Sequence, residues 1–344
     1  MKRNFAPKRS AIWCVLLLWV SVSLFFCSAY GQSEDDVHTA PRNTLKTLES
    51  GAETLPADGL PTRNPPSKPL HVDVDLVLVP VTVSDSMNRP VITLKKEDFA
   101  LYEEDKPKEI RYFSTESAPV SVAILLDVSK SMSDKIASER EAIVKFFNNA
   151  NPEDEYFAIA FSDRPQVVAS SERSLDELEQ KLTSIEPGGP TAMLDAVYLA
   201  VSELRSARYA RKAIVIISDG GDNASRFTLR EIKSVVQESD VRIYAIGLFD
   251  TFFFNTLEEK LGKKWLSEIT DRTGGRTITV DDRTKIPEAA AAISREIRNE
   301  YVLGYRPTGS AKSGWRRIRV QITSPDQGRL RAYYRLGYLV AHQN

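Results

Sequence analysis

The pattern of hydrophobic and polar positions changes several times along the chain. Residues 11–26 are apolar apart from two serines, and residues 32–70 show no regular apolar spacing. Residues 71–118 alternate with the two-residue period of β-strands. Residues 119–300 instead alternate short apolar runs with stretches of helical spacing, and residues 301–344 return to strand alternation. These changes predict distinct segments with different structures.

The central segment, 119–300, contains three continuous apolar runs, at 122–126, 213–217 and 241–246. Runs of this kind are typical of strands covered on both faces. Stretches with apolar residues at helical spacing separate them, as in Ile136, Ile143 and Phe147. Alternating strands and helices predict an α/β fold with a doubly wound, mainly parallel sheet.

The two flanking segments, 71–118 and 301–344, each contain too few strands for a stable independent sheet. We therefore expect the flanks to pair into one small β-sandwich, with the α/β domain inserted between them. Two separate β appendages are the alternative. Pro80 cannot donate to a strand ladder, so it is expected at an edge or a bulge. One C-terminal strand is predicted over Leu330–Leu339.

Aromatic residues alternate through the last segment and are expected to pack in the sandwich core; a carbohydrate-binding platform is the alternative. They are Tyr301, Tyr305, Trp315, Tyr333, Tyr334 and Tyr338.

The N-terminus has the features of a secretory signal peptide, assigned to residues 1–31. Basic residues precede the apolar stretch, and Ala29-Tyr30-Gly31 predicts cleavage before Gln32. The apolar stretch is shorter than the ~20 residues that a spanning helix needs. Residues 32–70 contain six prolines and no aromatic residue, which predicts a disordered proline-rich linker. The protein is expected to be secreted or periplasmic, or alternatively anchored to the membrane by an uncleaved N-terminal helix.

Composition narrows the possible functions. The 344 residues include 46 Lys+Arg and 47 Asp+Glu, so there is no basic excess of the kind that nucleic-acid binding requires. All three histidines lie outside the central segment, and both cysteines, Cys14 and Cys27, belong to the predicted signal peptide. A His-ligated zinc enzyme or a Ser-His-Asp hydrolase is therefore not expected.

Three polar clusters stand where strands are predicted to end or helices to begin. They contribute Asp127, Ser129 and Ser131, then Thr191, and then Asp219. Ligands of open α/β sheets bind beyond the carboxyl ends of the strands, so we expect these side chains to meet at one edge. Carboxylate and hydroxyl oxygens select hard cations, which predicts a site for Mg²⁺, or for Mn²⁺ or Ca²⁺.

At these positions the sequence resembles the von Willebrand factor type A domain, also called the integrin I-like domain. Asp127-x-Ser129-x-Ser131, Thr191 and Asp219 match its metal-ion-dependent adhesion site in order, and the resemblance covers about residues 119–300. It implies that Ser129, Ser131 and Thr191 bind the metal directly, while Asp127 and Asp219 act mostly through water. A carboxylate of a partner protein would take the open coordination position.

The flanks resemble exported VWFA-related proteins of Acidobacteria, on residues such as Glu97-Asp98-Phe99 and Gly337-Tyr338. Pro190, directly before Thr191, is a local departure that is expected to shift the threonine hydroxyl. Asp222 has no role in the matched motif and is interpreted as a surface turn residue.

These observations together predict an exported, metal-dependent protein-binding module for adhesion or scaffolding, and not an enzyme. The expected partner is an unknown protein with an exposed acidic residue; no nucleic acid is expected, and a membrane only if the signal stays uncleaved. A structural subunit for envelope assembly is the main alternative, and a metal-assisted hydrolase is a further one.

Overall fold

A computed structural model gives the structure of the chain beyond the predicted linker. The residues it describes all belong to the unit Leu70–Asn344. They are 76–115, 118–172, 174, 177–178, 180–181, 185–249, 257–307, 314–324 and 330–340. The predicted signal peptide and linker lie outside the described residues.

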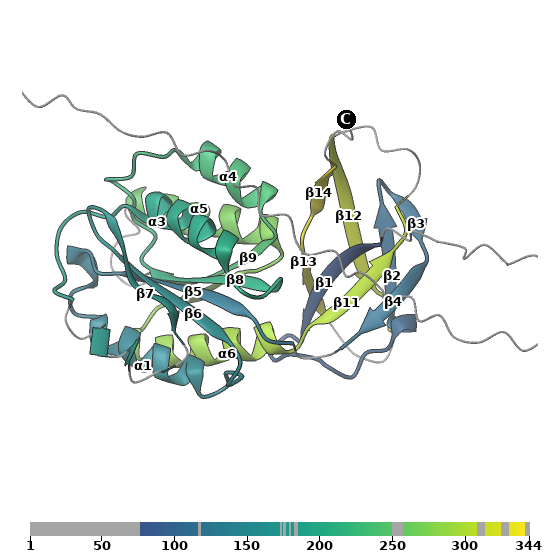
Figure 1. Ribbon diagram of the computed structural model, residues 1–344, viewed down its shortest axis with the longest axis horizontal. Coiled ribbons are helices and arrows are strands. Elements are labelled where there is room, and N and C mark those ends of the chain that lie inside the picture. Colours follow the sequence, from purple (N-terminus) through teal and green to yellow (C-terminus); the bar gives the residue numbers. More distant parts are fainter. Residues whose placement is uncertain are drawn as a thin grey trace, which may run out of the picture. The chain divides into compact units, whose positions relative to one another are not determined.

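Six strands form the central sheet in the order β10-β9-β8-β5-β6-β7 (Figure 1). Only the edge strand β7 is antiparallel to its neighbour; the other strands are parallel. The predicted doubly wound, mainly parallel sheet is therefore confirmed, with one antiparallel strand that the sequence pattern did not reveal. The strands are β5 Ser121–Asp127, β6 Glu155–Phe161, β7 Pro165–Glu172, β8 Lys212–Ser218, β9 Val241–Leu248 and β10 Thr277–Val280.

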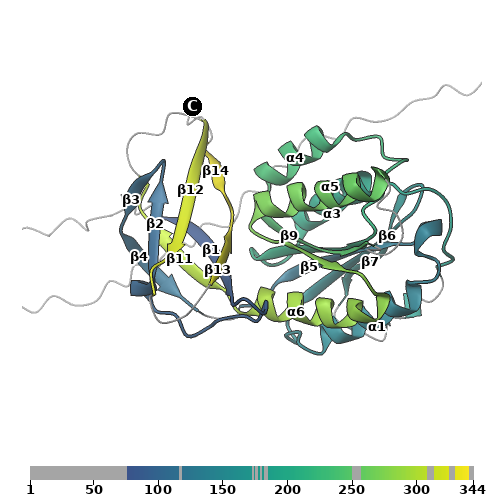
Figure 2. The same cartoon turned by 180° about the vertical axis from the view of Figure 1, so that it is seen from behind.

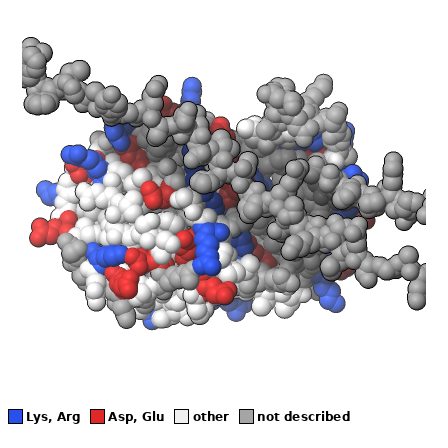
Figure 3. All heavy atoms as spheres, viewed as in Figure 1, with Lys and Arg blue, Asp and Glu red and all other residues white. Residues whose placement is uncertain are grey.

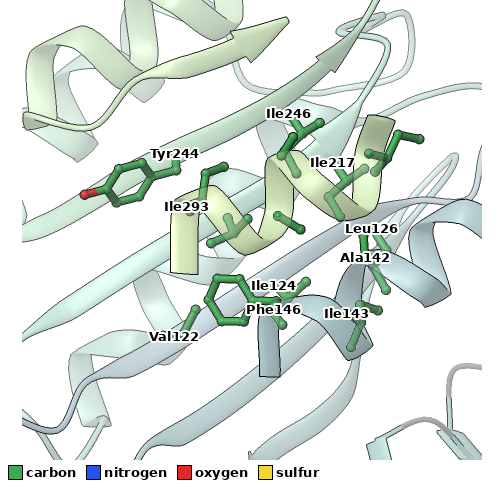
Figure 4. Packing of buried hydrophobic residues seen from close by; sticks show 14 of the residues in the cluster. Val122, Ile124, Leu126, Ala142, Ile143, Phe146, Ile217, Tyr244, Ile246 and Ile293 are labelled. Carbon is green, nitrogen blue, oxygen red and sulfur yellow. The ribbon is translucent and has the colours of Figure 1, made fainter. Parts of the chain in front are cut away.

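Helices cover both faces of this sheet, which is why its central strands are apolar on both sides. Helices α1 and α6 lie on one face, and α3, α4 and α5 lie on the other (Figures 1 and 2). Successive strand residues point to opposite faces, so Ile124 packs in the core under α1 and α6 (Figure 4), and Leu125 packs in the other core. The helices are α1 Ile136–Phe147, α3 Met193–Glu203, α4 Leu229–Glu238, α5 Leu257–Thr273 and α6 Ile286–Arg298, with short 3-10 helices η1 Lys96–Asp98, η2 Lys130–Met132, η3 Leu204–Ser206 and η4 Arg283–Lys285.

Strands from before and after the α/β domain pair with each other in two four-stranded sheets. Their orders are β13-β1-β11-β4 and β14-β12-β2-β3. One shared core, which includes Val81, Leu101 and Leu303, lies between them. The predicted insertion of the α/β domain into a β-sandwich is confirmed. The strands are β1 Val77–Ser84, β2 Phe99–Glu103, β3 Lys106–Lys108, β4 Ile110–Ser114, β11 Tyr301–Tyr305, β12 Gly314–Ile322, β13 Arg331–Tyr334 and β14 Gly337–Val340.

The single strand predicted over Leu330–Leu339 is wrong in one respect, because it is two strands in different sheets. β13 pairs with β1, and β14 pairs with β12. The chain changes sheet before Gly337, where a Cβ atom would lie 2.3 Å from the Arg316 carbonyl oxygen. Only glycine allows this close approach. Pro80 is paired with β11 alone, since the pairing of β1 with β13 begins at Val81; it therefore occupies a local edge.

The aromatic residues of the closing segment do not all behave as predicted. Tyr301 and Tyr305 are fully buried in the sandwich core, but Trp315 is 38% exposed. The expectation of core packing is wrong for Trp315, because it lies outside the sandwich core and opposite Leu339, which is itself 53% exposed.

Among the described residues, no helix has the length and apolar character required to cross a lipid bilayer. Figure 3 shows basic and acidic side chains interspersed over the visible surface of the described residues.

Candidate metal site

Asp127, at the C-terminal end of β5, is the buried centre of the candidate site. Its side chain is fully buried. The carboxylate atom Oδ1 accepts a hydrogen bond from the backbone N–H of Ser129 at 3.0 Å, and Oδ2 accepts one from the Ser218 hydroxyl at 2.6 Å. Because β8 lies directly beside β5, Ser218 and the following Asp219 reach the same end of the sheet.

The two candidate serines follow Asp127 in the turn that leads into η2. Their hydroxyl oxygens lie 3.1 Å apart. Ser129 is buried, whereas Ser131 is exposed. The turn is tied by its backbone to the loop before α3: Lys130 N–H donates to the Gly189 carbonyl at 3.1 Å, and Gly188 N–H donates to the Val128 carbonyl at 2.8 Å. The main chain therefore fixes the spacing between the serines and the Thr191 loop.

Thr191 is held from both sides of its peptide by Asn223. The Thr191 N–H donates to Asn223 Oδ1 at 2.8 Å. The Thr191 carbonyl accepts from the N–H groups of Asn223 at 2.9 Å and of Ala224 at 3.0 Å. These bonds connect the loop before α3 with the loop after β8, and they fix the threonine backbone independently of Pro190.

Gly221 borders both Asp219 and Thr191. Its N–H donates to Asp219 Oδ1 at 3.1 Å. A Cβ atom placed on Gly221 would lie 3.3 Å from Asp219 Oδ1 and 4.0 Å from Thr191 Oγ1. The absent side chain leaves space next to one oxygen from each residue. The structure thus brings Thr191 and Asp219 to the same glycine, and it places Asp127 beside Ser129 and within electrostatic range of Asp219. Ser131 joins this group through the hydroxyl of Ser129.

The electrostatics of the site favour a cation. Burial, as the larger cause, and the nearby negative charge of Asp219 together raise the pKa of Asp127 to about 6, while hydrogen bonds from Ser129 and Ser218 oppose the shift. Two carboxylates and three hydroxyls thus gather where negative charge is poorly compensated. This donor set fits a hard divalent cation such as Mg²⁺.

Clusters of three or more His, Cys, Asp or Glu side chains that could hold a metal are absent from the described ranges. The candidate site is not such a cluster, because only two of its five polar side chains are carboxylates and the other three are hydroxyls.

The interpretation of Asp222 as a surface turn residue is wrong. Its Oδ2 accepts from the N–H of Leu194 at 2.8 Å, in the first turn of α3, and from the Ser225 hydroxyl at 2.7 Å. In the opposite direction, Asp195 of α3 accepts from the N–H groups of Arg226 and Phe227. This reciprocal pair joins the start of α3 to the loop after β8.

Asn223 and Asp195 were not singled out by their place in the sequence. The signal that could have found Asn223 is its position two residues after Gly221, within a run of Gly, Asp, Asn and Ser that favours side-chain hydrogen bonds to nearby backbone. Its partner, Thr191, is 32 residues away in the chain, and no local pattern predicts that distance.

Comparison with known proteins places the similarity in the α/β domain. Residues 122–221 match the family described as von Willebrand factor type A domain. An uncharacterized protein of Borreliella burgdorferi is 23% identical over 188 residues, covering 48% of this chain and 55% of that protein. Inter-alpha-trypsin inhibitor heavy chain H4 of Homo sapiens is 28% identical over 146 residues, covering 38% of this chain and 16% of the heavy chain. The match thus spans about half of the first relative and a sixth of the second.

Among solved structures, a von Willebrand factor type A protein from Catenulispora acidiphila is similar with a TM-score of 0.46. It is 13% identical in sequence, and the alignment covers 76% of this chain and 74% of that one.

Proposed function

We propose, from the premise that this chain contains a von Willebrand factor type A domain, that it is a metal-dependent protein-binding module. Domains of this type are commonly metal-dependent interaction modules. In the proposal, Ser129, Ser131 and Thr191 hold a divalent cation directly, and Asp127 and Asp219 orient water and balance charge. A bound cation would supply one open coordination position for an outside carboxylate.

One observation supports the proposal: the Ser129 and Ser131 hydroxyls lie 3.1 Å apart at the end of β5, and oxygens of Asp219 and Thr191 border Gly221 after the neighbouring strand β8. Asp127 is buried without a basic side chain among the hydrogen-bond partners of its carboxylate. Burying the Asp127 carboxylate beside the half-buried carboxylate of Asp219 costs free energy unless a cation offsets their charge. Mg²⁺ is proposed as that cation, with Mn²⁺ or Ca²⁺ as substitutes.

The partner is proposed to present an acidic side chain. The chain's own residues would orient that carboxylate: Ser131 and Gly221 border the approach to the site, and Ser131 is exposed while Thr191 is buried. In this proposal the chain binds and does not catalyse. The described ranges contain neither histidine nor cysteine to act as a nucleophile or a general base near neutral pH.

The experiment that tests the proposal is calorimetry with Mg²⁺, followed by capture of envelope proteins by immobilised chain with and without EDTA. We expect millimolar or tighter Mg²⁺ binding, and captured proteins that are released by EDTA and are absent with Ser129→Ala. Capture that is equal with and without EDTA would contradict a metal-dependent mechanism. Substrate turnover that EDTA abolishes would favour a hydrolase instead.

Export is proposed from the N-terminal pattern of residues 1–31. The mature protein is then expected to begin near Gln32, and the proline-rich stretch that follows would be a tether. N-terminal sequencing of protein recovered outside the cytoplasm checks this. Finding Met1 or Lys2 retained in the membrane fraction would favour an anchored protein.

A further inference from the structure

A second site is suggested by a cleft at the opposite end of the central sheet from the candidate metal site. The cleft has a volume of about 580 Å³, which lies within the range of small-molecule sites. The first residues of β8 and β9 border it, whereas Asp127 and Ser218 close the other ends of β5 and β8. Residues of β1, β11, β12 and β14 form its other side.

One wall of the cleft is apolar and accessible. Leu78, Trp315 and Leu339 line it, and their exposed fractions are 51%, 38% and 53%. Trp315 of β12 and Leu339 of β14 are direct partners in the antiparallel register, so their side chains share one face of that sheet. Large apolar side chains gathered in a concave surface are a feature of ligand sites.

The opposite wall carries positive charge. Arg211 and Arg242 both pair with the single carboxylate of Glu300, so two guanidinium groups share one negative charge. Arg242 is only 8% exposed, which places this charge at the base of the cleft. Lys212 and Arg272 also line the cleft, and neither forms an ion pair within the part of the chain that the structure describes.

The acidic side chains that line the cleft do not cancel its positive charge. Five basic and three acidic side chains line the cleft, an excess of two positive charges. Helices α4, α5 and α6 also end there, and the partial negative charge of their last carbonyls offsets part of the excess. That effect falls off within one turn and amounts to about half a charge for each helix. Arg272 lies in the last turn of α5, and the Lys212 ammonium donates to the Arg205 carbonyl at 3.5 Å. Neither contact is an ion pair, so both side chains keep positive charge that an anion can use.

We propose that this cleft binds a small amphipathic anion, a molecule with a carboxylate or phosphate head and a hydrocarbon or aromatic body. The head would contact Lys212, Arg272 and the guanidinium of Arg242, because guanidinium groups recognise both carboxylate and phosphate. The body would lie on Leu78, Trp315 and Leu339. This binding does not depend on the candidate metal site.

The test measures binding to the full chain by calorimetry, with decanoate and decyl phosphate as probes. We expect saturable binding of at least one probe, and the comparison of the two affinities shows whether the cleft prefers a carboxylate or a phosphate head. The affinity should be unchanged in EDTA. Acetate lacks the apolar body and decyltrimethylammonium carries the opposite charge, so both are expected to bind at least about tenfold more weakly. Equal binding of decyltrimethylammonium would overturn the anion assignment.

Variants separate the cleft from the rest of the surface. Leu339→Ala and Lys212→Gln should each weaken the anionic probe about tenfold, as expected for losing an apolar contact or a charge-assisted contact. Ile92→Ala is the matched control, because Ile92 is a 58% exposed apolar residue of the sandwich outside the cleft.

Two results would overturn the proposal. The first is the absence of saturable binding by both probes. The second is a loss of affinity in Ile92→Ala equal to that in Leu339→Ala.

Discussion

Hydroxyl groups supply three of the five polar side chains in the candidate site, so single oxygens can be removed with little change in volume. The Ser129 and Thr191 side chains are buried, and their backbones are held by hydrogen bonds that an alanine would keep. Their hydroxyls can therefore be tested as ligands separately from their structural role.

Ser129→Ala and Thr191→Ala are each expected to lower Mg²⁺ affinity by about tenfold or more, while the fold survives. The proposed direct ligand is lost in each case, and calorimetry measures the change. Ser133→Ala is the control, because the Ser133 hydroxyl donates to the Lys130 carbonyl rather than facing the other candidate ligands. If the wild-type chain binds no Mg²⁺, Mn²⁺ or Ca²⁺ at millimolar concentration, the site does not hold a metal.

Glu139 of α1 is a second residue whose chemistry can be tested alone. It is 2% exposed, and Oε1 has no hydrogen-bond partner in the described structure. Burial raises its pKa well above the ordinary value for glutamate, and the charge of Asp127 adds to the shift. The folded state therefore prefers the protonated form.

Because the pKa of Glu139 is higher in the folded state than in the unfolded state, the folded state binds its proton more tightly. The free energy of unfolding is therefore highest at low pH, and it falls as pH rises from the ordinary pKa of glutamate to the raised pKa of the folded state. Glu139→Gln should remove this loss, so its melting temperature should exceed that of the wild type increasingly as pH rises. Each 1 kcal/mol corresponds to roughly 2–4 °C for a domain of this size. Thermal melts in EDTA from pH 4 to pH 9 measure this. Glu141→Gln, exposed on the same helix, should show no such trend.

The unit that organises the candidate site is a pair of connected loops rather than any one helix or strand. Asn223 fixes the Thr191 backbone, and Asp222 caps the start of α3. In the opposite direction, the Asp195 carboxylate of α3 accepts hydrogen bonds from backbone N–H groups in the loop after β8. The loops before α3 and after β8 are thus positioned by each other.

Asn223→Ala should lower both metal affinity and stability, the latter by about 1–2 kcal/mol for a lost backbone-to-side-chain hydrogen bond. Asn223→Asp keeps the acceptor oxygen and should retain more of the affinity. Thr228→Ala provides the contrast, because Thr228 caps α4 through Glu231. It should cost about 1 kcal/mol of stability and leave metal binding unchanged. Equal effects of Asn223→Ala and Thr228→Ala on Mg²⁺ affinity would count against the positioning role.

In the unit Leu70–Asn344, the sandwich is joined to the inserted α/β domain by a hydrogen bond to a buried ion pair of that domain. Arg276, before β10, pairs with Glu296 of α6 at 2.8 Å, and the exposed fractions of their side chains are 7% and 4%. The second oxygen of Glu296 accepts from the Thr82 hydroxyl of β1 at 3.0 Å. Removal of the sandwich would take away the Thr82 bond and expose the Arg276–Glu296 pair to solvent.

Deletion of residues 301–344 should therefore cause aggregation. It removes β11 and β12, so β1 and β2 lose their strand partners and expose apolar edges. Size-exclusion chromatography and the yield of soluble protein measure the outcome. A fragment of residues 71–118 that folds as a stable monomer would contradict a sandwich built from both flanks.

The sequence by itself determined the class of fold and the candidate ligand set, because both are written in local patterns. Continuous apolar runs predict strands covered on both faces, and Asp127-x-Ser129-x-Ser131 stands directly after such a run. The sequence also favoured pairing of the flanks, since neither has enough strands to bury its own apolar face.

Only the tertiary structure decided the features that depend on contacts between distant segments. The division of residues 330–340 between two sheets follows from the close approach of Gly337 to Arg316. The clamp of Asn223 on Thr191 and the shared Glu300 of Arg211 and Arg242 join segments 32 to 89 residues apart. Local periodicity records which face of an element is buried, but it does not record which partner completes a hydrogen bond, because that partner is chosen by packing.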